Sequence, residues 1–505
     1  MYENLLKAVT ELGSPKVLVV GDFMLDVYVY GDAERISPEA PVPVLRVTRT
    51  DYSCGGAGLV AANLCALGGA PLCVGVIGND ANGERLKGLL KAMGADVSGL
   101  MTVSDRPTTT KQRLIGLAQH RHQQQLFRMD CESTEPLTEQ QYGKLAGIFE
   151  NKLRRADIVC LQDYNKGVLA DSFCKQAIRL AAKARKRVLI DPSPVSNYSK
   201  YAGATLITPN RYETCMGVGF EIRTIEDAAR AGRQLVRKLN LEAVVITLDK
   251  EGAYLRSPDF DEHIPTRPRN VYDVTGAGDT VLATLALALA AGCDYKAAVQ
   301  LSNIAGGLKV EKFGGRTVTI DEVVTEIAYL NRGSEGKLRS VDSLAAELAW
   351  RRRQKQRIVF TNGCFDVIHR GHIEFLKFCR HQGDVVVVGL NSDKSVKIIK
   401  GPDRPIHNQV DRAAVLGAME SVDCIIIFDE PDPLKLIEKV RPDVLVKGRD
   451  WEKKGVVGAD FVRSYGGKVV LAPLVEGKSS TQVIEKIKSL AAKKKQARSK
   501  GGKSR

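Results

Sequence analysis

The strongest constraint in this sequence is a series of short runs that are apolar at almost every position and end at Gly, Asp, Pro or Asn. Such runs are typical of strands buried on both faces of a parallel sheet. Helical patterns separate them, which predicts a doubly wound α/β domain with ligand-binding loops at the C-terminal ends of the strands. The runs are VLVVGD (17–22), PLCVGVIGND (71–80), ADIVCLQD (156–163), RVLIDPS (187–193), ATLITPN (204–210) and AVVITLD (243–249).

A second series of apolar runs begins after a polar stretch at 331–343. Its members are IVFTNG (358–363), DVVVVGLNSD (384–393), DCIIIFD (423–429), PDVLVKGRD (442–450) and KVVLAPL (468–474). At 505 residues the chain is too long for one ordinary hydrophobic core, so more than one domain is expected. We predict a first domain at 1–332, a linker at 333–357, a second domain at 358–490 and a basic tail at 491–505.

Residues 26–50 alternate in a β-like pattern and contain three prolines. Proline cannot donate a ladder hydrogen bond, so this segment suits edge strands rather than a central sheet. We predict that it forms a small β-lid over the site of the first domain. The expected fold class is therefore α/β: a doubly wound domain with a β-lid, followed by a smaller Rossmann-like domain.

The net charge of +15 is concentrated in two blocks, so it does not indicate nucleic-acid binding by the domains. Seven positive charges lie at 493–505 and five in RRRQKQR (351–357), which leaves +3 for the rest. Neither block has interleaved aromatic residues, and both are expected outside the folded cores. No run of about 18 apolar residues predicts a membrane span. The N-terminus also lacks the hydrophobic region of a secretory signal, so a cytoplasmic location is expected. The eleven cysteines are odd in number and never spaced as CxxC, which favours reduced thiols.

The segment DVTGAGDT (273–280) precedes a helical pattern of small and apolar residues. Gly276 and Gly278 let backbone N–H groups close on an anion at the start of this helix, where the helix dipole also favours negative charge. Asp279 would then accept the proton of an attacking sugar hydroxyl, while the amides stabilise the transferred phosphoryl group. The alternative for so short a string is a helix cap with a structural aspartate.

Together with CGGAGLVAANLCALGG (54–69), this element resembles the two glycine-rich elements of the ribokinase (PfkB) family of carbohydrate kinases, and the resemblance covers about 16–320. It implies that Asp279 is the catalytic base and that the anion hole is formed by Gly276, Ala277 and Gly278. It also implies that ATP and its Mg²⁺, with Glu213 as a candidate ligand, are bound by Asn210, Arg211, Tyr212, Glu213, Thr247 and Gly252. Sugar hydroxyls would be bound by Asp26, Gly55, Gly56 and Asn63.

The sugar substrate is expected to carry a phosphate already, which calls for a cationic side chain near the sugar site. Lys166 stands out because it follows the predicted strand at 156–163; the other candidates are Arg35, Lys111, Arg113 and Arg128. A dinucleotide-binding fingerprint at 56–61 is the competing interpretation. It fails because TRTDYSC (48–54) is polar, whereas that fingerprint requires a buried strand before the turn.

The second domain contains FTNGCFDVIHRGHIEFL (360–376), in which a strand runs into a turn and two histidines open a helix. His369 and His372 would donate hydrogen bonds to phosphate oxygens as charge moves to a leaving group. A zinc site is not favoured, because neither an HExxH arrangement nor cysteine pairs accompany the histidines, and no resident metal is expected.

This string resembles the HxGH element of the cytidylyltransferase-like nucleotidyltransferases, over about 358–489. The resemblance implies direct attack of a substrate phosphate on the α-phosphate of a nucleoside triphosphate, with release of pyrophosphate. Besides His369 and His372, it implies nucleotide contacts from Phe365, Asp366, Gly371, Lys400, Arg404, Arg412, Lys447, Ser479, Ser480 and Thr481.

The pairing of these domains in this order resembles the bifunctional enzymes that make ADP-heptose, a precursor of the lipopolysaccharide core. The resemblance implies phosphorylation of D-glycero-β-D-manno-heptose 7-phosphate at O1 and adenylyl transfer to heptose 1-phosphate, with ATP and Mg²⁺ in both reactions. We expect a homodimer that binds small molecules, without a membrane or nucleic-acid partner. The alternatives are another sugar kinase fused to a cytidylyltransferase for a polyol phosphate, and a basic RNA-binding protein without either activity.

Overall fold

The computed structural model describes residues 3–116, 124–267, 269, 271–330, 337–452 and 455–473. Its contacts divide the chain into two compact units, one of Ala8–Glu326 and one of Ile327–Arg505 with Met1–Lys7. The helices α1 (Glu3–Thr10) and α10 (Ile320–Leu330) each span a point of this division. Among the described residues, no helix is both long enough and apolar enough to cross a membrane.

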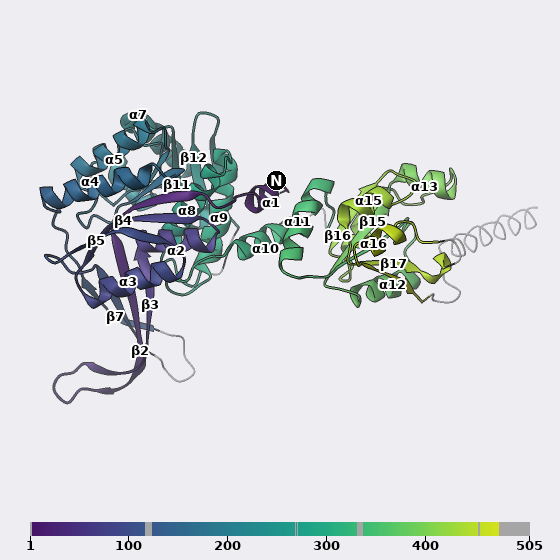
Figure 1. Ribbon diagram of the computed structural model, residues 1–505, viewed down its shortest axis with the longest axis horizontal. Coiled ribbons are helices and arrows are strands. Elements are labelled where there is room, and N and C mark those ends of the chain that lie inside the picture. The colour runs from purple at the N-terminus through teal and green to yellow at the C-terminus, as the bar shows by residue number, and fades with distance from the viewer. Residues whose placement is uncertain are drawn as a thin grey trace, which may run out of the picture. The chain divides into compact units, whose positions relative to one another are not determined.

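The first unit is built on a nine-stranded sheet (Figure 1). Its strand order is β13 (Asp261–Ile264), β12 (Ala253–Arg256), β11 (Ala243–Thr247), β10 (Leu206–Ile207), β9 (Val188–Asp191), β8 (Ile158–Gln162), β1 (Lys16–Gly21), β4 (Ala70–Gly78) and β5 (Asp96–Val103). The strands from β11 to β5 pair in parallel, whereas β12 and β13 pair antiparallel at one edge. All six runs of the first series are therefore central strands, which confirms the predicted doubly wound sheet.

Helices cover both faces of this sheet (Figure 1). On one side, α4 (Glu139–Leu153), α5 (Asp171–Lys183) and α7 (Ile225–Leu239) bury Phe149, Phe173 and Leu235 against strand residues such as Leu18 and Val20. On the other side lie α2 (Ala57–Ala66), α8 (Ala277–Ala290) and α9 (Tyr295–Val310). The remaining helices of this unit are α3 (Ala81–Ala92), α6 (Arg211–Val218) and the 3₁₀ turns η1 (Ser199–Tyr201) and η2 (Asp249–Glu251).

Local sequence explains where these helices begin and end. In α7, the Thr224 hydroxyl accepts from the Asp227 N–H and the Asp227 side chain accepts from the Thr224 N–H, which satisfies two donors at the helix start. Asn240 ends the helix in the left-handed conformation. The buried residues Ala228, Ala231, Leu235 and Leu239 recur every three to four positions, so one face of α7 packs on the sheet.

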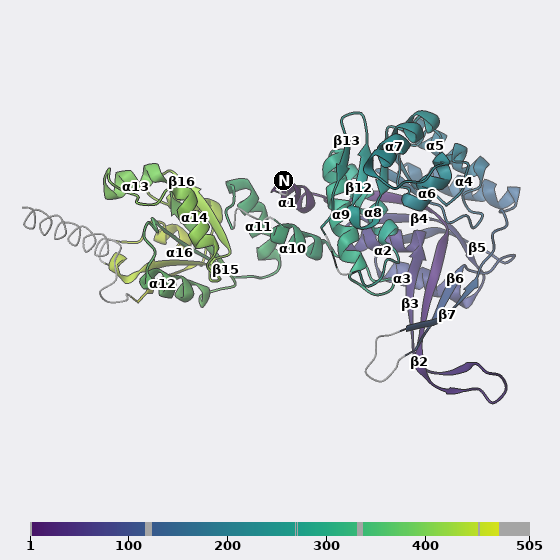
Figure 2. The ribbon, with the colours of Figure 1, turned by 180° about the vertical axis from the view of Figure 1, so that it is seen from behind.

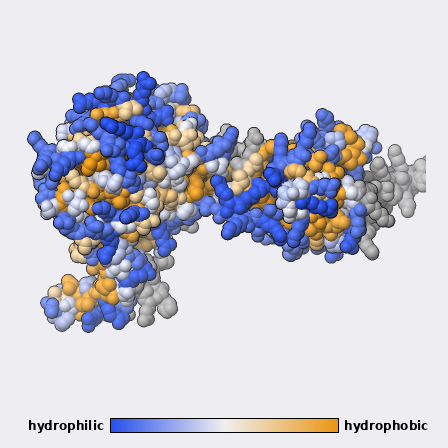
Figure 3. All heavy atoms as spheres, viewed as in Figure 1, coloured by the Kyte–Doolittle hydropathy of each residue, from blue (hydrophilic) through white to orange (hydrophobic). Residues whose placement is uncertain are grey.

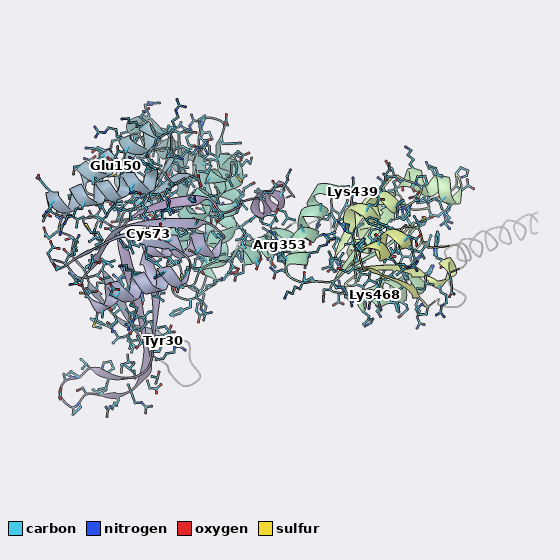
Figure 4. The ribbon with its side chains drawn as sticks, in the orientation of Figure 1. Tyr30, Cys73, Glu150, Arg353, Lys439 and Lys468 are labelled. Carbon is cyan, nitrogen blue, oxygen red and sulfur yellow. The ribbon has the colours of Figure 1, made fainter. Side chains whose placement is uncertain are left out.

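A separate four-stranded sheet forms the predicted lid, in the order β3 (Pro43–Gly56), β2 (Phe23–Ile36), β6 (Thr110–Gly116) and β7 (Gln124–Cys131). The ends of β2 and β3 extend as a two-stranded ribbon away from the main sheet (Figure 2), and Tyr30 lies near the base of this ribbon (Figure 4). TRTDYSC (48–54) belongs to exposed β3 and not to a buried parallel strand. The strand that precedes α2 is thus unlike the strand of a dinucleotide-binding fold.

The second unit contains a five-stranded parallel sheet in the order β16 (Cys424–Phe428), β15 (Val385–Asn391), β14 (Ile358–Gly363), β17 (Val444–Gly448) and β18 (Lys468–Ala472). Two buried clusters of apolar side chains lie within this unit. The sheet confirms the Rossmann-like expectation. Its helices are α12 (Arg370–Arg380), α13 (Asp393–Lys400), α14 (Gln409–Gly417), α15 (Leu434–Val440), α16 (Ala459–Ser464) and the 3₁₀ turn η3 (Arg449–Trp451).

The stretch expected to be a linker is folded in its described part. Residues 341–353 form α11 (Val341–Arg353), and Leu344 and Leu348 are buried in the same core cluster as β14 and α15. The Arg351 guanidinium forms an ion pair with the fully buried Glu347, whereas Arg352, Arg353 and Arg357 of the same basic block are exposed. In the described part of the stretch, α11 therefore packs with the second unit through Leu344, Leu348 and the Glu347 ion pair. The tail at 491–505 lies outside the described residues.

Candidate active sites

The first site is centred on Asp279, the third residue of α8. The residues of α8 from Asp279 to Leu289 are all buried, so the helix is fixed within the unit. Only 3% of the Asp279 residue is exposed. The first backbone N–H groups of a helix have no partner within it, so they are available to an anion beside this carboxylate.

Glycine is required in the loop that leads into α8. Gly276 is the N-cap, with φ +78°, and a Cβ at this position would lie 2.4 Å from Leu59 Cδ2 of α2. Gly278 is less restricted, since a Cβ there would lie 3.6 Å from Asp191 Oδ2. Ala277 begins the helix, and its N–H already donates to the Val274 carbonyl at 3.2 Å. The predicted anion loop therefore lies directly beside Asp279 and Asp191.

Two side chains that sequence reasoning missed hold the Asp279 carboxylate. The Gln162 amide donates to Asp279 Oδ1 at 3.0 Å and to Asp191 Oδ2 at 2.8 Å. The Tyr164 hydroxyl donates to the Asp279 oxygens at 3.1 and 3.3 Å. Gln162 ends β8 and Asp191 ends β9, so their positions at the C-terminal ends of predicted strands were the available signal.

Burial and like charge tune the protonation of this cluster. Desolvation raises the pKa of Asp279 to about 8, and the nearby Asp191 adds to the rise. Desolvation also raises the pKa of Asp191 to about 6. A carboxyl group whose pKa lies near neutrality is suited to accept a proton from a hydroxyl group during a reaction.

Charged side chains of the lid strands lie near this base. Asp26 of β2 and Arg113 of β6 form a buried ion pair at 2.7 Å. Lys111, which is paired with Asp26 in the strand register, places its ammonium 4.9 Å from the centre of the Tyr164 ring. The Gly55 backbone packs against Asp26, because a Cβ at Gly55 would lie 2.7 Å from Asp26 Oδ2. Lid and base thus converge on one region.

The other predicted sugar-site residues are Gly56, Asn63 and Lys166. Gly56, with φ +54°, caps α2 and could not carry a Cβ, which would lie 2.4 Å from the Asp22 carbonyl oxygen. Asn63 is fully buried in α2, and its Oδ1 accepts the Val318 N–H at 3.3 Å. Lys166 forms an ion pair with Glu132 at 2.6 Å, so its charge is already compensated.

The predicted nucleotide element at α6 is a reciprocal helix cap. Asn210 Oδ1 accepts the Glu213 N–H at 2.9 Å, and Glu213 Oε2 accepts the Asn210 N–H at 2.8 Å. Burial, with repulsion from Asp191, raises the pKa of Glu213 to about 8, which places this carboxyl near the acidic cluster. Arg211 forms ion pairs with Glu251 and Asp249, whereas Tyr212 is 65% exposed.

The segment TLDKEG (247–252) lies beside this cap at the start of α6. The Thr247 N–H donates to the Pro209 carbonyl at 3.0 Å, so the end of β11 adjoins the start of α6. Gly252 has φ +98°, and a Cβ there would lie 2.3 Å from the Ile264 carbonyl oxygen, so only glycine fits this turn. Asn210, Thr247 and Gly252 are therefore grouped around one loop cluster.

The second site opens at the start of α12, where His369 is the N-cap. Its Nδ1 accepts the Gly371 N–H at 3.1 Å, and His372 Nδ1 accepts the His369 N–H at 3.4 Å. The two rings stack with centroids 4.0 Å apart. Since Nδ1 of each ring accepts, a neutral ring carries its proton on Nε2, from which it can donate to a phosphate oxygen.

His372 is expected to be neutral in this arrangement. Desolvation, with repulsion from His369, lowers the pKa of His372 to about 4. The Phe365 ring contributes to this burial, with its centroid 5.3 Å from that of His372. The pair thus acts through oriented N–H donors at a helix N-terminus.

Asp366, three residues before His369, binds the loop at 404–407. Its Oδ1 accepts the Ile406 N–H at 2.6 Å and the His407 N–H at 3.2 Å, and its Oδ2 accepts Arg404 Nε at 2.5 Å. Asp366 is buried, so these bonds fix the segment 404–407 against the turn after β14. Of the predicted set, Asp366 and Arg404 are brought together with the histidine turn.

Two predicted phosphate contacts are engaged within the protein. Arg412 is 1% exposed and donates to the carbonyl oxygens of Cys364, Asn391 and His407 and to Asp393, so its side chain ties loops together. Lys447 donates to Asn362 Oδ1 at 2.5 Å, and burial lowers its pKa to about 8.

Lys400 ends α13 and is exposed. Ser479, Ser480 and Thr481 lie outside the described residues.

Comparisons with known proteins match the two units separately and together. The model of the pfkB family carbohydrate kinases matches residues 14–322, and the cytidylyltransferase-like model matches 360–486. The chain is 44% identical over 471 residues to the bifunctional protein HldE of Geobacter metallireducens, covering 93% of this chain and 95% of that protein. It is 43% identical to the HldE protein of Geotalea uraniireducens, covering 94% and 96% of the two chains.

A solved structure supports the fold of the first unit. Phosphofructokinase-2 from Escherichia coli, solved in complex with substrates and products, aligns with a TM-score of 0.52 at 22% identity. The alignment covers 63% of this chain and 100% of that chain. This likeness concerns the fold alone.

Proposed function

Because the chain belongs to the family of bifunctional HldE proteins, we propose that its units catalyse the two ATP-dependent steps on either side of a dephosphorylation in ADP-heptose synthesis. The protein is an enzyme that joins a carbohydrate kinase to a nucleotidyltransferase. The first unit phosphorylates D-glycero-β-D-manno-heptose 7-phosphate at O1. The second unit transfers AMP from ATP to D-glycero-β-D-manno-heptose 1-phosphate. Fusion to a cytidylyltransferase for a polyol phosphate is not favoured, since the relatives that match almost the whole chain are HldE proteins.

In the kinase reaction, Asp279 takes the proton from the O1 hydroxyl as O1 attacks the γ-phosphorus of ATP. The bond from the γ-phosphorus to the bridging oxygen breaks, and ADP leaves. Backbone N–H groups of the loop at Gly276 and Gly278 stabilise the transferred phosphoryl group, together with that of Ala277, which would have to leave the Val274 carbonyl. The contacts of Asp279 with Gln162 and Tyr164 support this proposal, because they aim the carboxylate at the anion loop.

On the sugar side, we propose that the hydroxyl groups bind Asp26, Asn63 and the backbone of Gly55 and Gly56. Lys166 remains the proposed partner of the 7-phosphate, which would have to displace Glu132 from its ammonium. On the ATP side, Asn210, Arg211, Tyr212 and Glu213 with Thr247 and Gly252 line the proposed nucleotide subsite.

In the adenylyl transfer, an oxygen of the sugar 1-phosphate attacks the α-phosphorus of ATP and pyrophosphate leaves. The attacking group is already anionic, so the step needs no general base. The Nε2–H groups of His369 and His372 donate to the phosphate oxygens. Phe365, Asp366, Gly371 and Arg412 shape the turn, while Lys400, Arg404, Lys447, Ser479, Ser480 and Thr481 are the proposed triphosphate contacts.

The observation that carries the kinase assignment is the buried Asp279 at the start of α8. Asp279→Asn should abolish formation of heptose 1,7-bisphosphate, followed by mass spectrometry with ATP, Mg²⁺ and heptose 7-phosphate. Pyrophosphate release with heptose 1-phosphate should be unchanged, whereas His369→Ala should give the reverse pattern. An unchanged kinase rate in Asp279→Asn would refute the assignment, and faster pyrophosphate release with CTP than with ATP would favour the cytidylyltransferase.

A Mg²⁺ ion bound with ATP is the proposed cofactor of each reaction. In the first unit, Glu213 is the proposed protein-side ligand, directly or through water. Repulsion between Glu213 and Asp191 supports this, because a divalent cation between or beside these carboxyls would relieve it. Bound Mg²⁺ supplies charge neutralisation on the phosphates. A Glu213→Gln variant should need more Mg²⁺ for half-maximal kinase activity; an unchanged requirement would contradict the role.

A homodimer formed through the lid is the proposed assembly. The lid exposes large apolar side chains, among them Ile36, Val47 and Phe127, at 64%, 57% and 61% exposure (Figure 3). Exposed apolar clusters of this kind mark association surfaces. Light scattering should find a dimer that Val47→Asp with Phe127→Asp dissociates, while Met93→Asp, outside the lid, leaves it intact. A wild-type monomer would refute this proposal.

A cytoplasmic location and the domain bounds also remain proposals. All eleven cysteines are free, which suits a reducing compartment. We retain a kinase domain at 1–332, and we place the start of the second domain before α11, because α11 is part of its core.

A further inference from the structure

A buried lysine behind the anion loop has no part in the mechanism described so far. Lys309 lies one residue before the end of α9 and is 0% exposed. Its Nζ donates to the Gly314 carbonyl at 2.6 Å, and none of the described carboxylates forms an ion pair with it. An ammonium group taken out of water without a paired charge is costly, so a site that keeps one calls for an explanation.

The side chain lies against the anion loop itself. A Cβ built on Gly276 would lie 3.3 Å from Lys309 Cε and 3.6 Å from Asp279 Oδ2. The aliphatic end of Lys309 and the carboxylate of the base therefore flank the same glycine. Burial lowers the pKa of Lys309, and the nearby Asp273, Asp279 and Asp26 oppose this shift by favouring the charged ammonium.

Lys309 also anchors a segment that joins the anion loop to the lid. Asp273 accepts the Gly314 N–H at 2.8 Å and the Thr275 N–H at 2.9 Å, while Lys309 holds the Gly314 carbonyl. On the lid side, a Cβ at Gly314 would lie 3.1 Å from the Tyr28 ring. The two polar groups of Gly314 are thus both fixed by charged side chains around the anion loop.

Resting on the kinase assignment above, we propose that Lys309 is a positioning residue of the kinase site: its ammonium clamps the Gly314 segment to the anion loop and supplies a fixed positive charge beside Asp279. This charge favours the ionised form of the base in the resting enzyme. It also offsets the negative charge that ATP and the sugar phosphate bring into a cluster rich in carboxylates.

The groups that face Asp279 set the direction of the expected pH effect. Burial raises the pKa of Asp279 most, Asp191 from β9 and Asp26 from the lid add to the rise, and Tyr164 and Lys111 lower it. Loss of the Lys309 charge raises this pKa further. The acid limb of the kinase profile of kcat/KM should then move to higher pH, so that the defect is largest at low pH.

The experiment uses the full-length protein and three substitutions at this position: Lys309→Gln, Lys309→Met and, for chemical rescue, Lys309→Ala. Lys309→Gln keeps a donor for the Gly314 carbonyl but removes the charge, whereas Lys309→Met removes both. Lys312→Met is the matched control, because Lys312 lies in the same segment but binds Glu322 and the Thr317 carbonyl. Adenylyl transfer to heptose 1-phosphate and the melting temperature report whether each variant is folded.

We expect kinase kcat to fall about 10- to 100-fold in Lys309→Gln and further in Lys309→Met, with the acid limb shifted upward. Methylammonium should partly restore activity in Lys309→Ala, because it can supply the missing charge, and should not affect the wild type. Kinase activity and pH profile in Lys309→Gln equal to those of the wild type would overturn the proposal. A loss that is equal at every pH and is not rescued would also overturn it, since such a loss is purely structural.

Asp279→Asn in the same assays separates this inference from the kinase assignment. If Asp279→Asn is inactive while the Lys309 variants behave as the wild type, only the role of Lys309 fails. If Asp279→Asn retains full kinase activity, the assignment of the base fails, and the role of Lys309 beside it fails as well.

Discussion

At the residue scale, the chemistry of each unit depends on how a few buried polar groups are paired. Asp279 is held by Gln162 and Tyr164, and its pKa is raised by burial to about 8. His372 is held by the His369 backbone, and its pKa is lowered to about 4. One site is therefore arranged for a proton acceptor, and the other for neutral hydrogen-bond donors.

Tyr164→Phe should weaken the kinase by removing the hydroxyl that donates to Asp279. Loss of this donor destabilises the carboxylate, so the acid limb of kcat/KM, expected near pH 8 in the wild type, should move upward. We expect kcat at pH 7 to fall about tenfold with little change in KM for ATP. The matched control is Tyr142→Phe, which loses a hydroxyl bonded to the Gly167 carbonyl. Equal profiles for both variants would contradict a role of Tyr164 through the base.

Asp279→Asn should stabilise the first unit while it abolishes kinase activity. The folded pKa of Asp279 is raised from 3.8 to about 8, so this group makes stability fall as pH rises from about 4 to about 8. Asparagine removes that penalty, and we expect a gain of about 1 kcal/mol or more at pH 8, roughly 2–4 °C in melting temperature. Calorimetry at pH 5 and pH 8 checks this, because the gain should be smaller at pH 5.

At the element scale, α8 and α11 show two different relations between sequence and structure. The small-residue pattern of α8 predicts a buried helix, and all its residues from Asp279 to Leu289 are buried. The pattern of α11 predicts an exposed basic helix, yet Leu344, Leu348 and the charged Glu347 lie in the core. The difference arises because Glu347 is neutralised by Arg351, one turn along the same helix, and by Arg339, which precedes the helix.

Leu348→Ala should destabilise the second unit by about 2–5 kcal/mol, because it opens a cavity where α11 packs on β14 and α15. Val341→Ala, at the exposed start of the same helix, should cost less than about 0.5 kcal/mol. Urea denaturation followed through adenylyltransferase activity measures both. Equal stability of the two variants would mean that α11 is a linker after all.

At the scale of the whole molecule, the chain consists of two units with separate cores and separate sites. Calorimetry should therefore record two unfolding transitions. Leu348→Ala should lower one of them and leave the other unchanged, whereas Asp279→Asn should raise the second and leave the first. A single transition that both variants shift together would show that the units unfold as one.

The sequence by itself determined the central parallel strands of each sheet, the α/β class, the order of the two units, and the loops with Asp279 and the histidine pair. These features are local, because apolar runs, glycine turns and helix starts are written in adjacent residues. Only the tertiary structure decided which polar groups meet. Gln162, Tyr164 and Asp191 surround Asp279 although more than 80 positions separate them from it, and Lys309 reaches the anion loop from the end of another helix. Burial then decides the charge of each group, since desolvation depends on everything packed around it and not on its neighbours in the chain.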